Sequence, residues 1–223
     1  IISGVIMGSG LGYRISSILT SVAGTSMLLL LVLTMVVSLI MGMGVPTTAA
    51  YLVLASLVAP TMIQLGIPPL AAHMFIFYFG CISSITPPVA LAAYAGAGLA
   101  GCDPNKTGYK AFRLAFCSFL MPYLFVYNPV LLMEGGVLDI LWSLVTALIG
   151  AYLLASGFEG FFFRWSLKWF ERPLMILGAV MLIVPGMVTD LVGIAIIVVE
   201  FVTEFMFKRS EKFVPVTVSQ STT

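Results

Sequence analysis

The chain has 223 residues, of which 61% are hydrophobic and only 9% are charged, and its mean hydropathy is +1.14. A soluble domain carries about 25% charged residues, so this composition excludes a water-soluble globular protein. No Asp, Glu, Lys or Arg lies between Arg14 and Asp103, an interval that could not form a solvated surface. The sequence therefore predicts an all-α integral membrane protein with about six or seven embedded segments of roughly 20 residues.

Charge and cysteine content exclude several other classes of protein. The net charge of +1 does not supply the concentrated basic face that nucleic-acid phosphates require, so we expect no nucleic-acid partner. The three cysteines, Cys81, Cys102 and Cys117, show no metal-ligand spacing. The sequence also has no nucleophile elbow, acid–base constellation or phosphate-cradling loop. We therefore expect no enzyme activity and no cofactor.

The first segments in chain order are apolar or amphipathic. Residues 1–11 are typical of the tail of a span, so we expect the chain to be the C-terminal part of a longer protein. Residues 13–25 mix Arg14 with serines, threonines and spaced aliphatic residues. That pattern predicts a helix lying along the membrane interface.

Two long apolar runs follow, and both are interrupted by Gly, Pro and hydroxyl residues. The run over 26–60 is interrupted at 42–48, and the run over 70–100 is interrupted at 83–88. Because Gly and Pro disfavour continuous helix, each run is predicted to contain two helical pieces rather than one.

The next part of the chain contains a polar interval and two further apolar runs. Residues 103–113 carry three basic residues and are predicted to form a loop, whereas 114–133 and 137–156 are predicted spans. The order of these segments predicts two crossings after the basic loop.

The C-terminal part, 157–207, is predicted to form an interfacial helix and a membrane hairpin. Aromatic and charged residues alternate over 158–172, which is typical of an aromatic belt at the membrane surface. Two apolar arms then flank a break at 185–187, and the polar tail 208–223 is predicted to be disordered.

Basic residues predict the orientation of these segments in the membrane. Cytoplasmic loops carry an excess of Lys and Arg. Three clusters are therefore expected on the cytoplasmic side: Lys106, Lys110 and Arg113; Arg164, Lys168 and Arg172; and Lys208, Arg209 and Lys212. Glu134 and Asp139 lie where the two predicted spans, 114–133 and 137–156, meet. They are therefore expected on the outer side.

The two interruptions carry the chemistry expected of an ion or substrate site. Breaks in a membrane helix free backbone carbonyls, which hydrocarbon cannot satisfy, and such ends bind cations and anionic substrates. The candidate binding residues are Gly42, Met43, Gly44, Pro46, Thr47, Thr48, Ser83, Ser84, Ile85, Thr86, Pro87 and Pro88. Their neutral oxygens suit a weakly held alkali cation. The candidate ligands for sodium are Gly42, Gly44, Thr48, Ser84 and Thr86.

A structural interpretation of the same residues stays open. The breaks are then proline kinks whose Ser and Thr side chains bond to the preceding helical turn. In that case the chain is a non-transporting membrane scaffold or assembly subunit. His73, the only histidine, is expected to form an interfacial or inter-helix hydrogen bond rather than a proton relay.

Three segments together resemble a known family. They are GMGVPTTAAY at 42–51, PPLAAHMFIFY at 68–78 and ITPPVALAAY at 85–94. These motifs, in this order and spacing, resemble the large permease subunit of TRAP transporters, in particular the fused TAXI-type branch. The resemblance covers residues 1–133, whereas the region after Phe158 is similar to an additional membrane segment of some TAXI permeases.

The resemblance implies the second half of an inverted-repeat, elevator-type transporter with a re-entrant hairpin over 26–60 and a discontinuous helix over 70–100. The opposite assignment of the two breaks stays open. It also implies sodium-coupled uptake of a small organic acid in a prokaryotic inner membrane, with sodium as the coupling ion. The implied partners are an extracytoplasmic substrate-binding protein and the N-terminal half of the permease. This chain alone is then not expected to form a complete translocation pathway.

Overall fold

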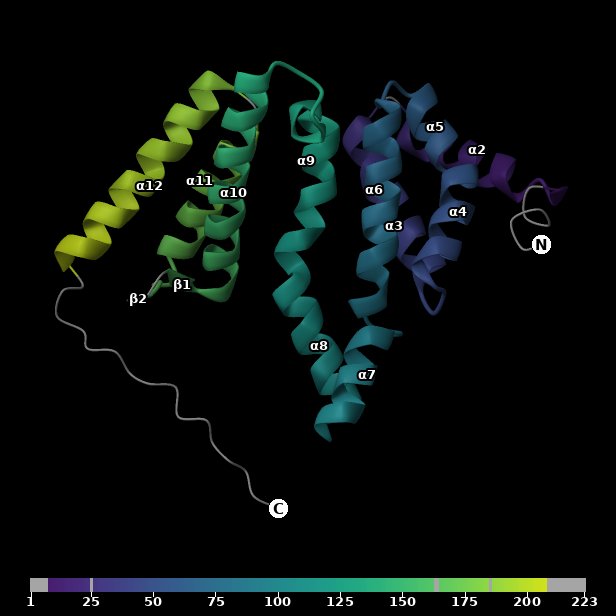
Figure 1. Ribbon diagram of the computed structural model, residues 1–223, viewed down its shortest axis with the longest axis horizontal. Coiled ribbons are helices and arrows are strands. Elements are labelled where there is room, and N and C mark those ends of the chain that lie inside the picture. The colour runs from purple at the N-terminus through teal and green to yellow at the C-terminus, as the bar shows by residue number, and fades with distance from the viewer. Residues whose placement is uncertain (1–7, 25, 163–164, 185, 208–223) are drawn as a thin grey trace. The chain divides into compact units, whose positions relative to one another are not determined.

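The computed structural model describes residues 8–24, 26–162, 165–184 and 186–207, shown as ribbon in Figure 1. The chain divides after Leu141 into two compact units. Helices account for nearly all regular structure in the described ranges, apart from two strands of two residues each. The predicted all-α class is therefore confirmed for this part of the chain.

The first unit is built from short helices. Their bounds are α2 Leu11–Ala23, α3 Met27–Gly42, α4 Thr47–Leu57, α5 Ala59–Gln64, α6 Pro69–Ile82, α7 Leu91–Ala100, α8 Pro104–Ala115 and α9 Met121–Tyr127, with the 3-10 turns η1 Ser83–Ile85, η2 Phe116–Leu120 and η3 Pro129–Leu132. Both interrupted runs contain two helices each, as predicted. The structure does not test whether α2 lies along the membrane interface. The polar tail 208–223 lies outside the described residues.

Helix α6 forms the centre of the first unit, because it packs against α3, α4, α5 and α9. Phe75 and Phe79 of α6 are fully buried. Both rings meet Tyr123 of α9 edge to face, with centroid separations of 5.2 and 6.1 Å. Such aromatic contacts add directional attraction to apolar burial. This packing fixes the orientation of α6, and with it the position of its C-terminal end.

The predicted polar loop at 103–113 is wrong, because these residues form α8. Asp103 caps the helix, and its Oδ1 accepts a hydrogen bond from the Lys106 backbone N–H at 2.9 Å. Pro104 occupies the first turn, where its fixed φ favours a helix and its missing N–H costs nothing. The capping residues therefore start a helix here, although the polar composition of the segment favours a loop.

The predicted span over 114–133 is also not one continuous helix. The chain passes from α8 through η2 into α9, then through η3. Asn128 ends α9 and Pro129 follows, and a proline lacks the N–H that continues an α-helix. The apolar run is thus divided into short helical pieces.

The second unit contains α10 from Trp142 onward, the strands β1 Phe161–Phe162 and β2 Trp165–Ser166, and the helices α11 Glu171–Ile183 and α12 Met187–Phe207. The full helix α10 spans Val137–Glu159, and among the described residues it is the one helix long and apolar enough to cross a membrane. Its Leu144, Val145 and Leu148 side chains are exposed, as lipid contact requires.

Glycines allow the three helices of the second unit to pack closely. A Cβ at Gly150 of α10 would lie 3.1 Å from the Ala179 carbonyl oxygen of α11. A Cβ at Gly193 of α12 would lie 3.1 Å from the Gly178 carbonyl oxygen of α11. Small residues at such contacts are typical of membrane helix pairs, because backbones can approach there.

The helix predicted over 158–172 does not form. Gly160, with φ of 78°, ends α10, and Phe161 then pairs with Ser166 in an antiparallel hairpin. Left-handed glycine terminates helices because it carries no Cβ, and the aromatic residues that follow favour strand. The aromatic segment therefore leads by a short hairpin into α11, while its position at the membrane surface stays a prediction.

Candidate functional site

The two helix breaks lie at the same end of the first unit. Helix α3 leads down to the first break, α4 returns in the opposite direction, and α6 again runs parallel to α3 (Figure 1). Because α3 and α6 also pack against each other, their C-terminal ends are neighbours. Two segments about forty residues apart in sequence therefore meet.

The contact between the breaks is made by Gly42 and Ser83. A Cβ at Gly42 would come within 2.9 Å of the Ser83 Cβ and 3.5 Å of the Gly80 carbonyl oxygen. A Cβ at Gly44 would lie 3.6 Å from Cγ1 of Val89, between η1 and α7. The glycines thus let the first turn rest directly on the second interrupted segment.

The first break is a tight turn between α3 and α4. The Val45 backbone N–H donates to the Gly42 carbonyl at 3.4 Å, and Gly44 has φ of 75°, a conformation that favours glycine. Pro46 precedes α4 with extended backbone, so the new helix begins at Thr47. The Thr47 side chain is half-buried and that of Thr48 is exposed.

The second break lies between η1 and α7. The Thr86 backbone N–H donates to the Ser83 carbonyl at 3.2 Å, and the Ala90 N–H donates to the Thr86 carbonyl at 3.1 Å. The Tyr94 hydroxyl donates to the Pro88 carbonyl at 2.7 Å. One carbonyl freed by the prolines is thereby satisfied by a side chain of the following helix.

Three hydroxyl groups of the second break donate to the preceding helical turn. Ser83 Oγ donates to Gly80 O at 2.6 Å, Ser84 Oγ to Cys81 O at 2.7 Å and Thr86 Oγ1 to Ile82 O at 2.9 Å. These bonds occupy the hydroxyl protons, as the structural interpretation of the breaks expects. Each oxygen still has lone pairs that can accept a bond or bind a cation.

The structure brings together some of the predicted site residues and separates others. Ser83 and Thr86 are buried beside the contact with Gly42, whereas Pro88 and Thr48 are exposed at the same end of the unit. Within the described ranges, no three His, Cys, Asp or Glu side chains form a metal-binding group. The oxygen atoms available to bind a cation at the two breaks are therefore those of backbone carbonyls and side-chain hydroxyl groups.

Three buried polar residues were not predicted as part of the site. Among the described residues, Thr34 Oγ1, Ser38 Oγ and Asn128 Oδ1 are buried and have no hydrogen-bond partner. Ser38 lies about one turn, and Thr34 about two turns, before Gly42 on α3. Unpaired buried polar atoms cost free energy, so they mark places where a ligand or water can bind. The four-residue spacing of Thr34, Ser38 and Gly42 was the available signal.

His73 forms the inter-helix hydrogen bond that the sequence predicts. Its Nδ1 lies 3.1 Å from the Tyr51 hydroxyl, which joins α6 to α4. The Tyr51 ring also meets Phe77 edge to face, with centroids 5.6 Å apart. This contact holds the returning arm α4 against α6 and so stabilises the first turn.

The apolar helices, and the length of α10 that suffices to cross a membrane, are those expected of a helical membrane protein. Residues 1–140 match the protein family described as "Tripartite ATP-independent periplasmic transporter, DctM component". The chain therefore belongs to this family, the large permease component of TRAP transporters, and it is a transport protein rather than an enzyme. No curated protein and no solved structure matches the chain.

The family match coincides with one of the two structural units. It ends at residue 140, and the first unit ends at Leu141. Both interrupted runs lie inside the match, which confirms the resemblance to the large TRAP permease subunit. The helices α11 and α12 lie outside it, so the second unit is an addition to the matched region.

Proposed function

We propose that this chain supplies the second repeat of a sodium-coupled permease that imports a small organic acid. The observation that carries the proposal is the contact of Gly42 with Ser83, which unites two helix breaks at one point. Transporters bind ions and substrates where paired discontinuous helices meet. The TAXI-like motifs at 42–51 and 85–94 support the fused, C-terminal type of permease.

In this proposal the first break is the tip of a re-entrant hairpin and the second is the unwound part of a spanning helix. The antiparallel packing of α3 and α4 around one tight turn supports the hairpin. The separation of α7 from α6 by eight residues of non-α backbone supports the unwound helix. Sodium then binds to carbonyls at Gly42 and Gly44 and to hydroxyl oxygens of Thr48, Ser84 and Thr86.

The proposal includes two partners and a location. The tripartite family implies a periplasmic binding protein that delivers the substrate. We further propose that an N-terminal permease half completes the pathway, that the two halves exchange access by an elevator motion, and that the assembly resides in the prokaryotic inner membrane. A membrane potential of 100 mV adds about 2.3 kcal/mol to the entry of each sodium ion.

Thermal unfolding of the purified chain in detergent tests the cation site. A ligand that binds only the folded state raises the melting temperature, so NaCl should stabilise the chain more than KCl at equal ionic strength. Thr86→Val and Thr48→Val keep the side-chain shape but remove one oxygen each, and both should weaken the sodium-specific shift. Thr20→Val is the matched control, because its hydroxyl donates within α2 to Ser17 O.

A second measurement links the site to transport. The complete permease with its binding protein is reconstituted in liposomes, and uptake of radiolabelled organic acids is followed against sodium concentration. Thr86→Val should raise the sodium concentration for half-maximal uptake. Unchanged sodium dependence in both break-site variants would instead favour kinks whose hydroxyls bond only to backbone.

A further inference from the structure

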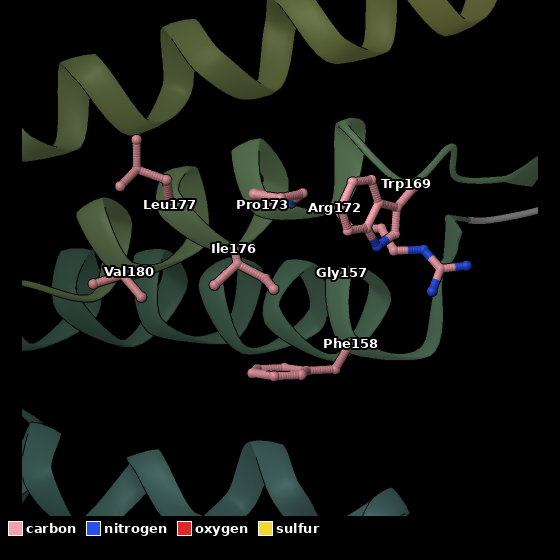
Figure 2. Close-up of a pocket in the computed structure, with 8 residues that line it drawn as sticks. All are labelled: Gly157, Phe158, Trp169, Arg172, Pro173, Ile176, Leu177 and Val180. Atoms are coloured by element: carbon pink, nitrogen blue, oxygen red, sulfur yellow. The ribbon is translucent and has the colours of Figure 1, made fainter.

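The second unit carries an apolar groove that the transport proposal does not use. Its volume is about 510 Å³, within the ~300–1,000 Å³ range of small-molecule sites. The end of α10, the segment just before α11, and α11 as far as Val180 form its walls (Figure 2). The lining residues are Gly157, Phe158, Trp169, Arg172, Pro173, Ile176, Leu177 and Val180.

The groove is chemically asymmetric along its length. Leu177 and Val180 lie at one end in Figure 2, and Trp169 and Arg172 lie at the other. Leu177 and Val180 remain 50% and 40% exposed, so the aliphatic end is open to its surroundings. An occupant must therefore be apolar over most of its length and polar or charged at one end.

The Arg172 side chain is held in place at the polar end. Its Nε donates to the Leu167 carbonyl at 3.4 Å, and its guanidinium group lies against Gly160, where a Cβ would collide with it. A guanidinium group has five N–H donors in a planar fork that matches phosphate oxygens. Within the described part of the chain this guanidinium group donates one hydrogen bond, from Nε, which leaves its other N–H groups for a ligand.

Two further side chains extend this polar end. The Lys168 ammonium group lies 5.8 Å from the centre of the Phe170 ring, and its side chain is exposed. The Trp169 side chain is 87% exposed at the edge of the groove. Exposed tryptophan beside basic residues is typical of the level at which lipid headgroups meet the acyl region.

We propose that the groove binds one anionic phospholipid. An acyl chain lies along Pro173, Ile176, Leu177 and Val180, and the headgroup phosphate contacts Arg172 and Lys168. Charge complementarity favours this occupant, because Arg172 and Lys168 are both basic and basic residues near a membrane surface attract anionic lipids. The neighbouring Glu171 carboxylate accepts a hydrogen bond from the Lys168 backbone N–H at 2.6 Å, so it is held by backbone beside the two cations. A second copy of the chain or a protein helix would bury the aliphatic end but leave no phosphate for the two cations.

Brominated lipids test the proposal, because bromine quenches tryptophan fluorescence at short range. The full chain is reconstituted in vesicles of phosphatidylcholine containing dibrominated phosphatidylglycerol or, separately, dibrominated phosphatidylcholine. Subtraction of the Trp169→Phe signal isolates Trp169 from the other tryptophans. Phosphatidylglycerol should be preferred by roughly fivefold for each basic residue that contacts it.

Three variants distinguish a lipid site from general lipid contact. Arg172→Gln and Lys168→Gln should each lower the preference for phosphatidylglycerol, and Val180→Phe should fill the groove and reduce quenching by both lipids. Lys110→Gln on α8 is the control for charge, and Leu191→Phe on α12 is the control for size. Neither should change the preference for phosphatidylglycerol or the extent of quenching.

Equal quenching by the two lipids in the unmodified chain would overturn the proposal. So would a preference that survives both Arg172→Gln and Lys168→Gln. A change of oligomeric mass in Val180→Phe without any change in lipid quenching would assign the groove to a second copy of the chain instead.

Discussion

Gly42, at the end of α3, rests on the side chain of Ser83 at the end of α6, so closely that a Cβ on Gly42 would come within 2.9 Å of the Ser83 Cβ. Ser83 is buried and is held by its own bond to Gly80 O. It therefore cannot move away without losing that bond. The contact couples the turn after α3 to the interrupted segment after α6.

The first prediction concerns this contact. Gly42→Ala should lower the stability of the chain by about 1–3 kcal/mol, the cost of overpacking a closed contact. Thermal unfolding in detergent measures the loss. Adding Ser83→Gly should restore part of the stability, because it removes the atoms that collide, and a double-mutant cycle reports the coupling.

Gly96→Ala is the control for the first prediction. Gly96 lies within α7, and a Cβ there would meet no atom within 4 Å. Alanine should therefore stabilise the helix by up to about 1 kcal/mol. Equal effects of Gly42→Ala and Gly96→Ala would show that the two breaks are not in contact.

The second prediction concerns a polar pair in the second unit. Trp142 Nε1 donates to Asp190 Oδ2 at 2.8 Å, and Asp190 is only 7% exposed. Trp142→Phe should cost about 1–3 kcal/mol, because it leaves a buried acceptor without its donor. Asp190→Asn should cost less, since an amide oxygen still accepts this bond. Thermal unfolding of each variant is compared.

The double variant Trp142→Phe with Asp190→Leu provides the internal check on this pair. It removes donor and acceptor together and should be more stable than Trp142→Phe alone. If Trp142→Phe alone leaves the melting temperature unchanged, the hydrogen bond does not stabilise the packing of α10 against α12.

The third prediction concerns the start of α8. Asp103→Ala removes the acceptor of the Lys106 N–H and should cost about 1 kcal/mol, as for other N-caps. Asp103→Asn retains a capping oxygen and should be close to neutral. Thermal unfolding tests both, and equal losses in the two variants would mean that charge rather than capping matters.

The fourth prediction concerns orientation in the membrane. Lys106 lies in the first turn of α8, and Glu134 follows η3, at the far end of the column that α8 and α9 form (Figure 1). In a background without Cys81, Cys102 and Cys117, Lys106→Cys should be labelled from the cytoplasm and Glu134→Cys from outside. Labelling of both from one side would exclude a crossing between them.

Much of the fold was predictable because its causes are local. Pro46 lies directly before the start of α4, and Pro87 and Pro88 lie between η1 and α7, so the prolines of both apolar runs mark breaks between helices. The wrong assignments at 103–113 and 158–172 have local causes as well. Asp103 and Pro104 start α8 in a polar interval, and Gly160 stops α10 before the aromatic segment, so capping signals carried more information than composition there.

The sequence by itself determined that this is a helical membrane protein and where its helices break, because charge, hydropathy and proline act over a few residues. Only the tertiary structure decided which groups meet. The parallel course of α3 and α6 brings Gly42 to Ser83, and packing of α10 and α12 joins Trp142 to Asp190. The burial of Thr34 and Ser38 likewise depends on side chains from other helices. Contacts between distant segments follow from helix packing, which no local pattern specifies.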